Sequence, residues 1–289
     1  MTHVRVGAAQ IASVPGDIPA NLGLHLATIA EARARAVDLL VFPELSLTGY
    51  ESQPDTAHLS RSADGPELRR LAEAARGLVT VVGFMEANGG APPFNSCAIL
   101  ADGKIVHIHR KLNLPTYGGL VEGLYYEAGA TLVLPPTPLG RTACLICADA
   151  WDPALPWLAA LQGAEAFIVP VASALGAVAP GFDSRANWLL NLRYMAMTYG
   201  LPVVMTNHCG GAGALDFWGG SMILNAYGEL LAEAGAAPEL LVTDVDPAEA
   251  GVARRRLPTI RDSNVPLVRE LLHDSRTGAG IRAQAARPI

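Results

Sequence analysis

The feature that most constrains the fold is an alternation of short, continuous apolar runs with longer segments whose apolar residues recur every three or four positions. The short runs are rich in Val, Ile and Leu, which is typical of strands buried on both faces, and the longer segments are typical of one-sided helices. We expect strands at 4–11, 39–45, 78–85, 96–101, 104–110, 142–147, 166–172, 202–207, 221–226 and 240–246, and helices near 20–36, 66–76, 154–162 and 184–199.

Two hairpins interrupt this alternation. Asp102-Gly103 is a favoured two-residue turn, and a second turn is predicted around Tyr227-Gly228. Hairpins among alternating helices and strands indicate an α/β layered domain with mixed sheets. Because no linker-like stretch precedes the C-terminus, we expect one domain over 1–272. The tail at 273–289 has lost its apolar period and is either a flexible end or an arm on a partner subunit.

The charge balance excludes several classes of partner. A net charge of −6 and a pI of about 5.6 argue against a nucleic-acid or anionic-membrane surface. The basic run 254–256 lies beside acidic residues and is predicted to be a solvated helix end. No stretch of about 18 apolar residues is present, and the N-terminus lacks a signal-peptide pattern. We therefore expect a cytoplasmic protein with reduced cysteines and no membrane or nucleic-acid partner.

Common catalytic and cofactor motifs are missing. The sequence contains no G-x-S-x-G, no G-x-x-x-x-G-K-[ST] and no H-E-x-x-H, and its glycine cluster at 210–220 does not fit G-x-G-x-x-G. His107 and His109 would share a strand face, but no third ligand with a recognisable spacing follows them. We therefore predict ordinary strand histidines, no metal site and no cofactor.

The segment TACLICADAW carries Cys144 and Cys147 as C-x-x-C. This spacing could mark a redox pair, half of a metal site or one working thiol. Residues three apart on a strand point to opposite faces, which suits neither a shared metal ion nor a disulfide. We therefore expect Cys144 in the core and Cys147 at the end of the strand, where functional residues concentrate in α/β folds. A reversible disulfide between them is the alternative.

A thiol nucleophile needs a base and a group that stabilises the developing oxyanion. No histidine lies in a suggestive context. Glu44 ends one apolar run in VFPELSLTGY, and Lys111 ends another in HIHRKLNLP. Buried charges are costly unless they pair, so a Glu, a Lys and a Cys at three strand ends are candidates for one site.

Three segments, VFPELSLTGY, HRKLNLP and LICADAWDP, resemble in this order the signature segments of the nitrilase superfamily, the carbon–nitrogen hydrolases. The resemblance extends over roughly 4–270. It implies that Glu44 is the general base, Lys111 the oxyanion-stabilising lysine and Cys147 the nucleophile. Glu122, in YGGLVEGLYYEAG, matches the second glutamate of the family.

The resemblance implies a four-layer α-β-β-α sandwich with two mixed sheets, and subunits that pair as a homodimer or a higher homo-oligomer. It also implies hydrolysis of a non-peptide C–N bond of a small amide through a cysteine thioester, with release of ammonia or an amine. Ala148-Asp149 after the cysteine resembles amidase-like branches more than nitrile-hydrolysing ones. An N-carbamoyl amine or amino-acid hydrolase is the alternative, followed by a nitrilase. A catalytically silent binding protein is the alternative from another class.

The substrate-binding residues are less constrained by the sequence than the catalytic ones. The Ala148 N–H is expected near the oxyanion. Aromatic residues are more often core than pocket, but we expect substrate contacts from Tyr50, Tyr117, Ala148, Trp151 and Trp188. Leu124 stands where relatives often carry a basic residue, so an acidic substrate has no support.

Overall fold

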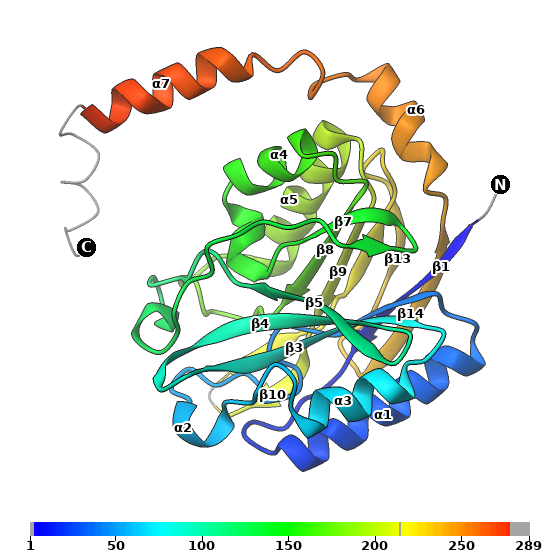
Figure 1. The fold of residues 1–289 in the computed structure, drawn as a ribbon, viewed down its shortest axis with the longest axis vertical. Helices are drawn as coiled ribbons and strands as arrows, with labels where there is room; N and C mark the ends of the chain where they lie inside the picture. Colours follow the sequence, from blue (N-terminus) through cyan, green and yellow to red (C-terminus); the bar gives the residue numbers. More distant parts are fainter. Residues whose placement is uncertain (1–2, 214, 278–289) are drawn as a thin grey trace.

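Two six-stranded sheets stack face to face, and a layer of helices covers the outer face of each (Figure 1). The computed structural model describes residues 3–213 and 215–277. The layers run from helices through two sheets to helices, so the predicted α/β class and four-layer sandwich are confirmed.

The first sheet has the strand order β14-β1-β2-β3-β4-β5. β1, β2 and β3 are parallel and the remaining pairs are antiparallel, so the sheet is mixed as predicted. Asp102 and Gly103 join β4 to β5 with φ values of 51° and 76°, the left-handed geometry of a two-residue hairpin. Its strands are β1 (Val4–Gln10), β2 (Leu39–Val41), β3 (Val79–Asn88), β4 (Ala91–Ala101), β5 (Lys104–Arg110) and β14 (Glu239–Val245).

The second sheet has the order β13-β12-β9-β8-β7-β6 and is also mixed, with β7, β8 and β9 parallel. Its strands are β6 (Pro136–Thr137), β7 (Gly140–Cys144), β8 (Ala166–Val171), β9 (Val203–Asn207), β12 (Met222–Leu224) and β13 (Leu230–Glu233). A separate hairpin is formed by β10 (Cys209–Ala212) and β11 (Leu215–Trp218). The glycine-rich segment around it did not predict strands, because glycine is disfavoured in them.

Four predicted helices form the outer layers. α1 (Ile18–Ala34) and α3 (Pro66–Ala74) cover the first sheet, while α4 (Ala154–Leu161) and α5 (Ser184–Tyr199) cover the second (Figure 1). Each layer encloses apolar side chains, and a third apolar core lies between the sheets. Burying one Val, Leu, Ile, Phe or Met side chain in these cores contributes about 1.5–3 kcal/mol to the free energy of unfolding.

Two further helices were not predicted, the single turn α2 (Thr56–Leu59) and α7 (Val265–Thr277), and of α6 (Ala248–Arg256) only the helix end at 254–256 was predicted. The basic run ends α6, but only Arg255 and Arg256 are exposed. Arg254 is half-buried and donates to two backbone carbonyls, so it is not part of a solvated end. No helix within 3–213 and 215–277 combines the length and the apolar character needed to cross a membrane.

The expected domain boundary at 272 falls inside α7, which stands away from the sandwich in Figure 1. Residues 278–289, which make up most of the expected tail, lie outside the described residues. The proposed role of the tail as an arm on a partner subunit stays a prediction.

Two strands end three or more residues earlier than predicted, at Val41 and at Cys144. After β2 the chain turns, with Leu45 at a φ of 50°; after β7 a 3-10 turn (Cys147–Trp151) begins, with Cys147 at a φ of 47°. Most residues of both turns are buried and apolar. Their apolar pattern therefore reflects burial and not a continuing strand. Glu44 and Cys147 therefore lie on turns beyond the strands.

Candidate active site

Both sheets contribute side chains to one buried cluster beyond the ends of their strands. Glu44 follows β2, Lys111 follows β5, Glu122 begins a 3-10 turn (Glu122–Leu124), and Cys147 begins the turn after β7. Glu44 and Lys111 are fully buried, Glu122 is buried, and Cys147 is partly exposed to a cavity. The structure thus brings together the four residues that the sequence singled out.

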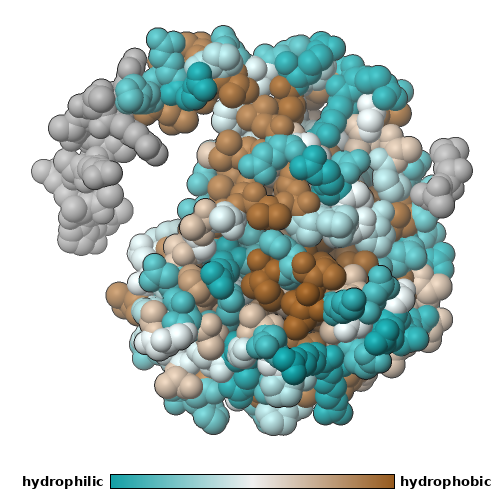
Figure 2. Space-filling view, viewed as in Figure 1, coloured by the Kyte–Doolittle hydropathy of each residue, from teal (hydrophilic) through white to brown (hydrophobic). Residues whose placement is uncertain are grey.

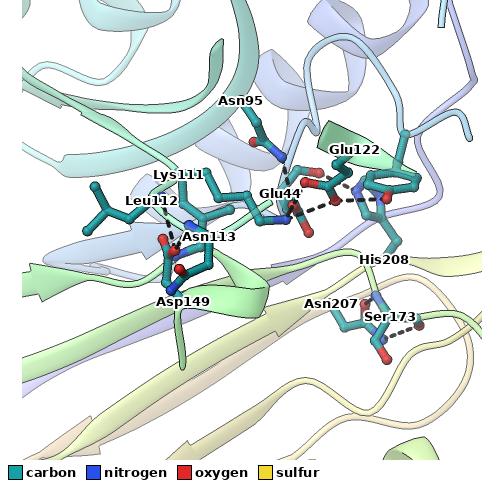
Figure 3. A network of polar contacts seen from close by, with 12 residues as sticks. Glu44, Asn95, Lys111, Leu112, Asn113, Glu122, Asp149, Ser173, Asn207 and His208 are labelled. Atoms are coloured by element: carbon teal, nitrogen blue, oxygen red, sulfur yellow. Dashed lines mark hydrogen bonds and ion pairs between the residues drawn. The ribbon is translucent and has the colours of Figure 1, made fainter. Parts of the chain in front are cut away.

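Lys111 lies between the two carboxylates (Figure 3). Its Nζ donates to Glu44 Oε1 at 2.5 Å and to Glu122 Oε2 and Oε1 at 2.7 Å and 2.9 Å. Burial alone would lower the pKa of Lys111, but the charges of Glu122 and Glu44 outweigh burial and raise this pKa well above its ordinary value. The ammonium therefore stays charged across the physiological pH range.

The two oxygens of Glu44 have different surroundings. Oε1 accepts from Lys111 and from Asn95 Nδ2, the latter at 2.8 Å. Oε2 is buried and has no hydrogen-bond partner. Leaving a buried carboxylate oxygen unpaired is costly, so this atom is available to accept a proton from a neighbour.

The turn that carries Glu44 is held from two sides. His208 Nε2 lies 2.6 Å from the backbone oxygen of Glu44 and donates to it. On the other side the turn lies directly on Gly83 of β3, where a Cβ atom would come within 2.4 Å of Leu45 N and Pro43 O. Only glycine permits this close approach.

Glu122 links Lys111 to Tyr50, whose hydroxyl donates to Glu122 Oε1 at 2.9 Å. Burial raises the pKa of Glu122 to about 7, against the opposing charge of Lys111 and with a further contribution from Glu44. Burial also raises the pKa of Tyr50 well above its usual value, so the phenol keeps its proton. The protonation of Glu122 therefore changes near neutral pH.

The thiol of Cys147 is a weak acid in its resting state. Burial raises the pKa of its thiol well above the ordinary value, and the carboxylates of Glu44 and Glu122 raise it further, while Lys111 opposes them. The thiol therefore carries its proton until a base removes it.

Asp149 holds the Lys111 and Cys147 segments together. Its Oδ1 accepts from the backbone N–H groups of Leu112 and Asn113 at 3.0 Å and 2.7 Å, and its Oδ2 accepts from Ile146 N at 3.1 Å. The carboxylate is fully buried and faces the backbone rather than the cavity. The sequence used Asp149 only as a sign of an amide rather than a nitrile substrate; the structure adds a positioning role.

A narrow cavity of about 40 Å³ opens beside Cys147. Trp151 and Trp188 meet edge to face on its wall, with ring centroids 4.9 Å apart, and Trp151 and Tyr117 are partly exposed. Leu124 is 77% exposed and lies outside this cavity. The five expected substrate contacts, Tyr50, Tyr117, Ala148, Trp151 and Trp188, all line the cavity.

Cys144 lies apart from the cavity, in the core between the sheets. Its thiol interacts with that of Cys97 on the opposite sheet, and all four cysteines are free. Among the described residues, no three His, Cys, Asp or Glu side chains are arranged to hold a metal ion.

Sequence reasoning did not find Asn95 and His208, which support the cluster, and it did not predict the positioning contacts of Asp149. A partial signal existed, because Asn95 and His208 are polar residues at the edges of apolar runs. Nothing in the spacing could show which backbone groups they meet.

Comparisons with known proteins agree on one family. The chain matches the family model described as carbon–nitrogen hydrolase over residues 5–255. It is 29% identical to the N-carbamoylputrescine amidase of Arabidopsis thaliana, across 89% of this chain and 91% of that protein. It is 30% identical to the glutamine-dependent NAD(+) synthetase of Thermotoga maritima, where the match covers 85% of this chain and 42% of the synthetase, so the chain spans less than half of that relative.

A solved structure with the same fold is a variant of the amidase from Nesterenkonia sp. AN1, which shows covalent addition of the acetamide moiety of fluoroacetamide at the active-site cysteine. The TM-score is 0.77 at 26% identity, and the match covers 93% of this chain and 97% of that one.

Proposed function

The chain belongs to the carbon–nitrogen hydrolase family, and from this premise we propose that it hydrolyses the C–N bond of a small amide through a thioester on Cys147. The observation that carries the proposal is Glu44 Oε2. It is the one carboxylate oxygen of Glu44 and Glu122 that has no partner, and it lies in the buried cluster that raises the pKa of the Cys147 thiol. Such an atom is suited to take the proton of the thiol.

In the first half of the reaction Glu44 removes the thiol proton and the sulfur of Cys147 bonds to the carbonyl carbon. Lys111 Nζ and the Ala148 N–H donate to the oxyanion that forms. Protonated Glu44 then gives its proton to the amide nitrogen as the C–N bond breaks. Ammonia or an amine leaves, and the acyl group stays on Cys147 as a thioester.

In the second half a water molecule replaces the departed amine. Glu44 takes a proton from the water as its oxygen bonds to the thioester carbon, and the same two donors meet the second oxyanion. The C–S bond breaks, and Glu44 returns the proton to the sulfur. The sum of both halves is amide plus water giving carboxylic acid plus ammonia or amine.

The proposal is tested by trapping the acyl intermediate with a slowly hydrolysed amide and locating it by peptide mass spectrometry. We expect the acyl mass on Cys147 in the wild-type protein and its absence in Cys147→Ala. Cys144→Ala is the matched control and should acquire the same mass as the wild type. An acyl adduct that persists in Cys147→Ala would contradict the assignment.

An N-carbamoyl hydrolase is the second candidate, because the similarity to the Arabidopsis thaliana amidase extends over 91% of that protein. Attack on a carbamoyl carbon uses the same residues and releases ammonia as well. A panel of aliphatic amides, N-carbamoyl compounds and nitriles, assayed for ammonia release, separates these candidates and the nitrilase alternative. A protein that releases ammonia from none of them fits a silent binding role.

We also infer that two copies pair through the α4–α5 layer. Leu190, Tyr194 and Met197 recur at steps of four and three along α5 and are 68%, 48% and 52% exposed. Figure 2 shows apolar side chains gathered on the side of the molecule where α4 and α5 lie. Light scattering should give twice the chain mass, and Leu190→Asp should shift the mass toward one chain.

The four free cysteines support a reducing, cytoplasmic setting.

A further inference from the structure

The cavity beside Cys147 offers no charge to a substrate beyond the groups that carry out the reaction. Building on the proposed function, we propose that the acyl group of the substrate is small and uncharged, and that the cavity rejects a carboxylate more strongly than an ammonium. Among the described residues, the cavity wall contains no Arg, Lys, His or Asp. The one glutamate on the wall is Glu122, which Lys111 and Tyr50 occupy.

The wall is apolar at nearly every position away from the thiol. A turn after β8 supplies one side, and the segment after β5 supplies the other. The apolar residues that line it are Pro115, Leu120, Ala148, Trp151, Ala172, Ala174, Ala177, Val178 and Trp188. Such a wall favours the methylene and methyl groups of an acyl chain.

Most of the polar atoms on the wall have hydrogen-bond partners within the protein. Ser173 Oγ accepts from Trp218 Nε1 at 3.0 Å, and the Ser173 N–H donates to Asn207 Oδ1 at 2.9 Å. Asn207 Nδ2 also donates to the backbone oxygen of Ser173 at 3.1 Å (Figure 3). Tyr50 donates to Glu122. Tyr117 at the half-exposed rim is left to contact a polar atom of the substrate.

Lys111 cannot serve a second anion. Its ammonium has three N–H donors. One donates to Glu44 and one to Glu122, and the third is needed for the oxyanion. A carboxylate on the acyl chain would lose its hydration without a partner, which is among the most unfavourable transfers in protein chemistry.

The expected order of rejection follows from the charges of the cluster. When Glu44 and Glu122 are both ionised, two negative charges face the single positive charge of Lys111, so the cluster has a net negative charge. It repels a carboxylate and attracts an ammonium. An ammonium still loses its hydration without a direct partner. Neutral acyl groups should therefore react fastest and anionic ones slowest.

This selection separates the chain from substrates suggested by its relatives. N-carbamoylputrescine carries an ammonium, and glutamine carries an ammonium and a carboxylate. Their charged groups need counter-charges in an enclosed site, and the described wall does not supply them. Butanamide and similar neutral amides meet no such requirement.

The experiment compares three amides of equal chain length: butanamide, 4-aminobutanamide and succinamate. Their charges lie close enough to the reacting carbon to fall inside the cavity. We expect the kcat/KM for ammonia release to be at least about 100-fold lower for 4-aminobutanamide than for butanamide, and lower again for succinamate. A charged amide that matches or exceeds butanamide would overturn this inference and leave the proposed function intact. Failure of all three to release ammonia would overturn both.

Charge variants of the wall give a second test, because Val178 is half-buried on the cavity. Val178→Lys should raise the ratio of succinamate to butanamide activity about tenfold or more, and Val178→Asp should do the same for 4-aminobutanamide. Val178→Met is the uncharged control and should leave both ratios in place. If the introduced charge leaves both activity ratios unchanged, the cavity wall does not select the charge of the acyl group.

Discussion

Cys144 and Cys147 are three residues apart, yet they occupy opposite kinds of surroundings. Cys144 ends β7 in the apolar core between the sheets, where its neighbour is the Cys97 thiol. Cys147 begins the following turn beside Glu44, Lys111 and a cavity. The same side chain is thus a packing element before the turn and a candidate nucleophile after it, because the turn carries it from an apolar layer into a cluster of charges.

The simplest expectation is that the reactive thiol is the more acidic of the two, and the structure indicates the reverse. The interaction with Cys97 lowers the pKa of Cys144, whereas burial and two carboxylates raise that of Cys147. The thiol expected to react is therefore the less acidic one at rest. Access to a substrate and to an unpaired oxygen of Glu44 distinguishes it, rather than a preformed thiolate.

The largest effect should come from removing the reactive sulfur. Cys147→Ala is expected to lower kcat/KM by at least about 10⁴-fold, because no group is left to form the covalent intermediate. Its thermal unfolding midpoint should stay near that of the wild type, which shows that the loss is chemical. Residual activity above about one per cent of wild type would contradict the assignment of Cys147 as the nucleophile.

The next effect should come from Glu122. The pKa of this carboxyl is raised to about 7, so it is protonated below that pH and then weakens its hold on Lys111. We expect wild-type kcat/KM to fall as pH decreases through about 7. Glu122→Gln should be slower by about 10²–10³-fold and lack this acid limb. Profiles of kcat/KM between pH 5 and 9 check both, and an unchanged acid limb in Glu122→Gln would assign the titration to another group.

Asp149 ties the Lys111 segment to the Cys147 turn, so Asp149→Asn should affect both activity and stability. An amide cannot accept all three backbone N–H groups, so we expect a loss of about 1–3 kcal/mol in the free energy of unfolding. A misplaced thiol should lower kcat by about 10–100-fold with less effect on KM. Asp152→Asn is the matched control, since Asp152 is half-buried. Chemical denaturation and steady-state kinetics should distinguish the two variants.

The smallest effect should come from Cys144. Cys144→Ala removes one buried sulfur and should reduce the free energy of unfolding by about 1 kcal/mol, while kcat/KM stays within about threefold. Thiol titration before and after oxidation gives the complementary measurement. A reversible loss of two thiols mapped to Cys144 and Cys147 would restore the redox alternative that the structure disfavours.

Much of the sandwich could be predicted, because continuous apolar strands, one-sided helices and the Asp102-Gly103 turn are local patterns. The ends of β2 and β7 could not, since their buried turns continue the apolar pattern past the last hydrogen bond of the strand. Family resemblance brought Glu44, Lys111 and Cys147 together before any geometry was known. The hydrogen bonds of Asp149 were not predicted, because the backbone N–H groups that it accepts from leave no mark on the sequence.

The left-handed backbone of Cys147 has a consequence for how this protein evolves or is engineered. At a φ of 47°, a residue with a side chain costs about 1–2 kcal/mol that glycine would not. Cys147→Gly should therefore unfold at a higher temperature than Cys147→Ala, as calorimetry would show. A selection for heat resistance alone would then favour a glycine at this position and an inactive protein. The cysteine persists there only as long as turnover is selected along with folding.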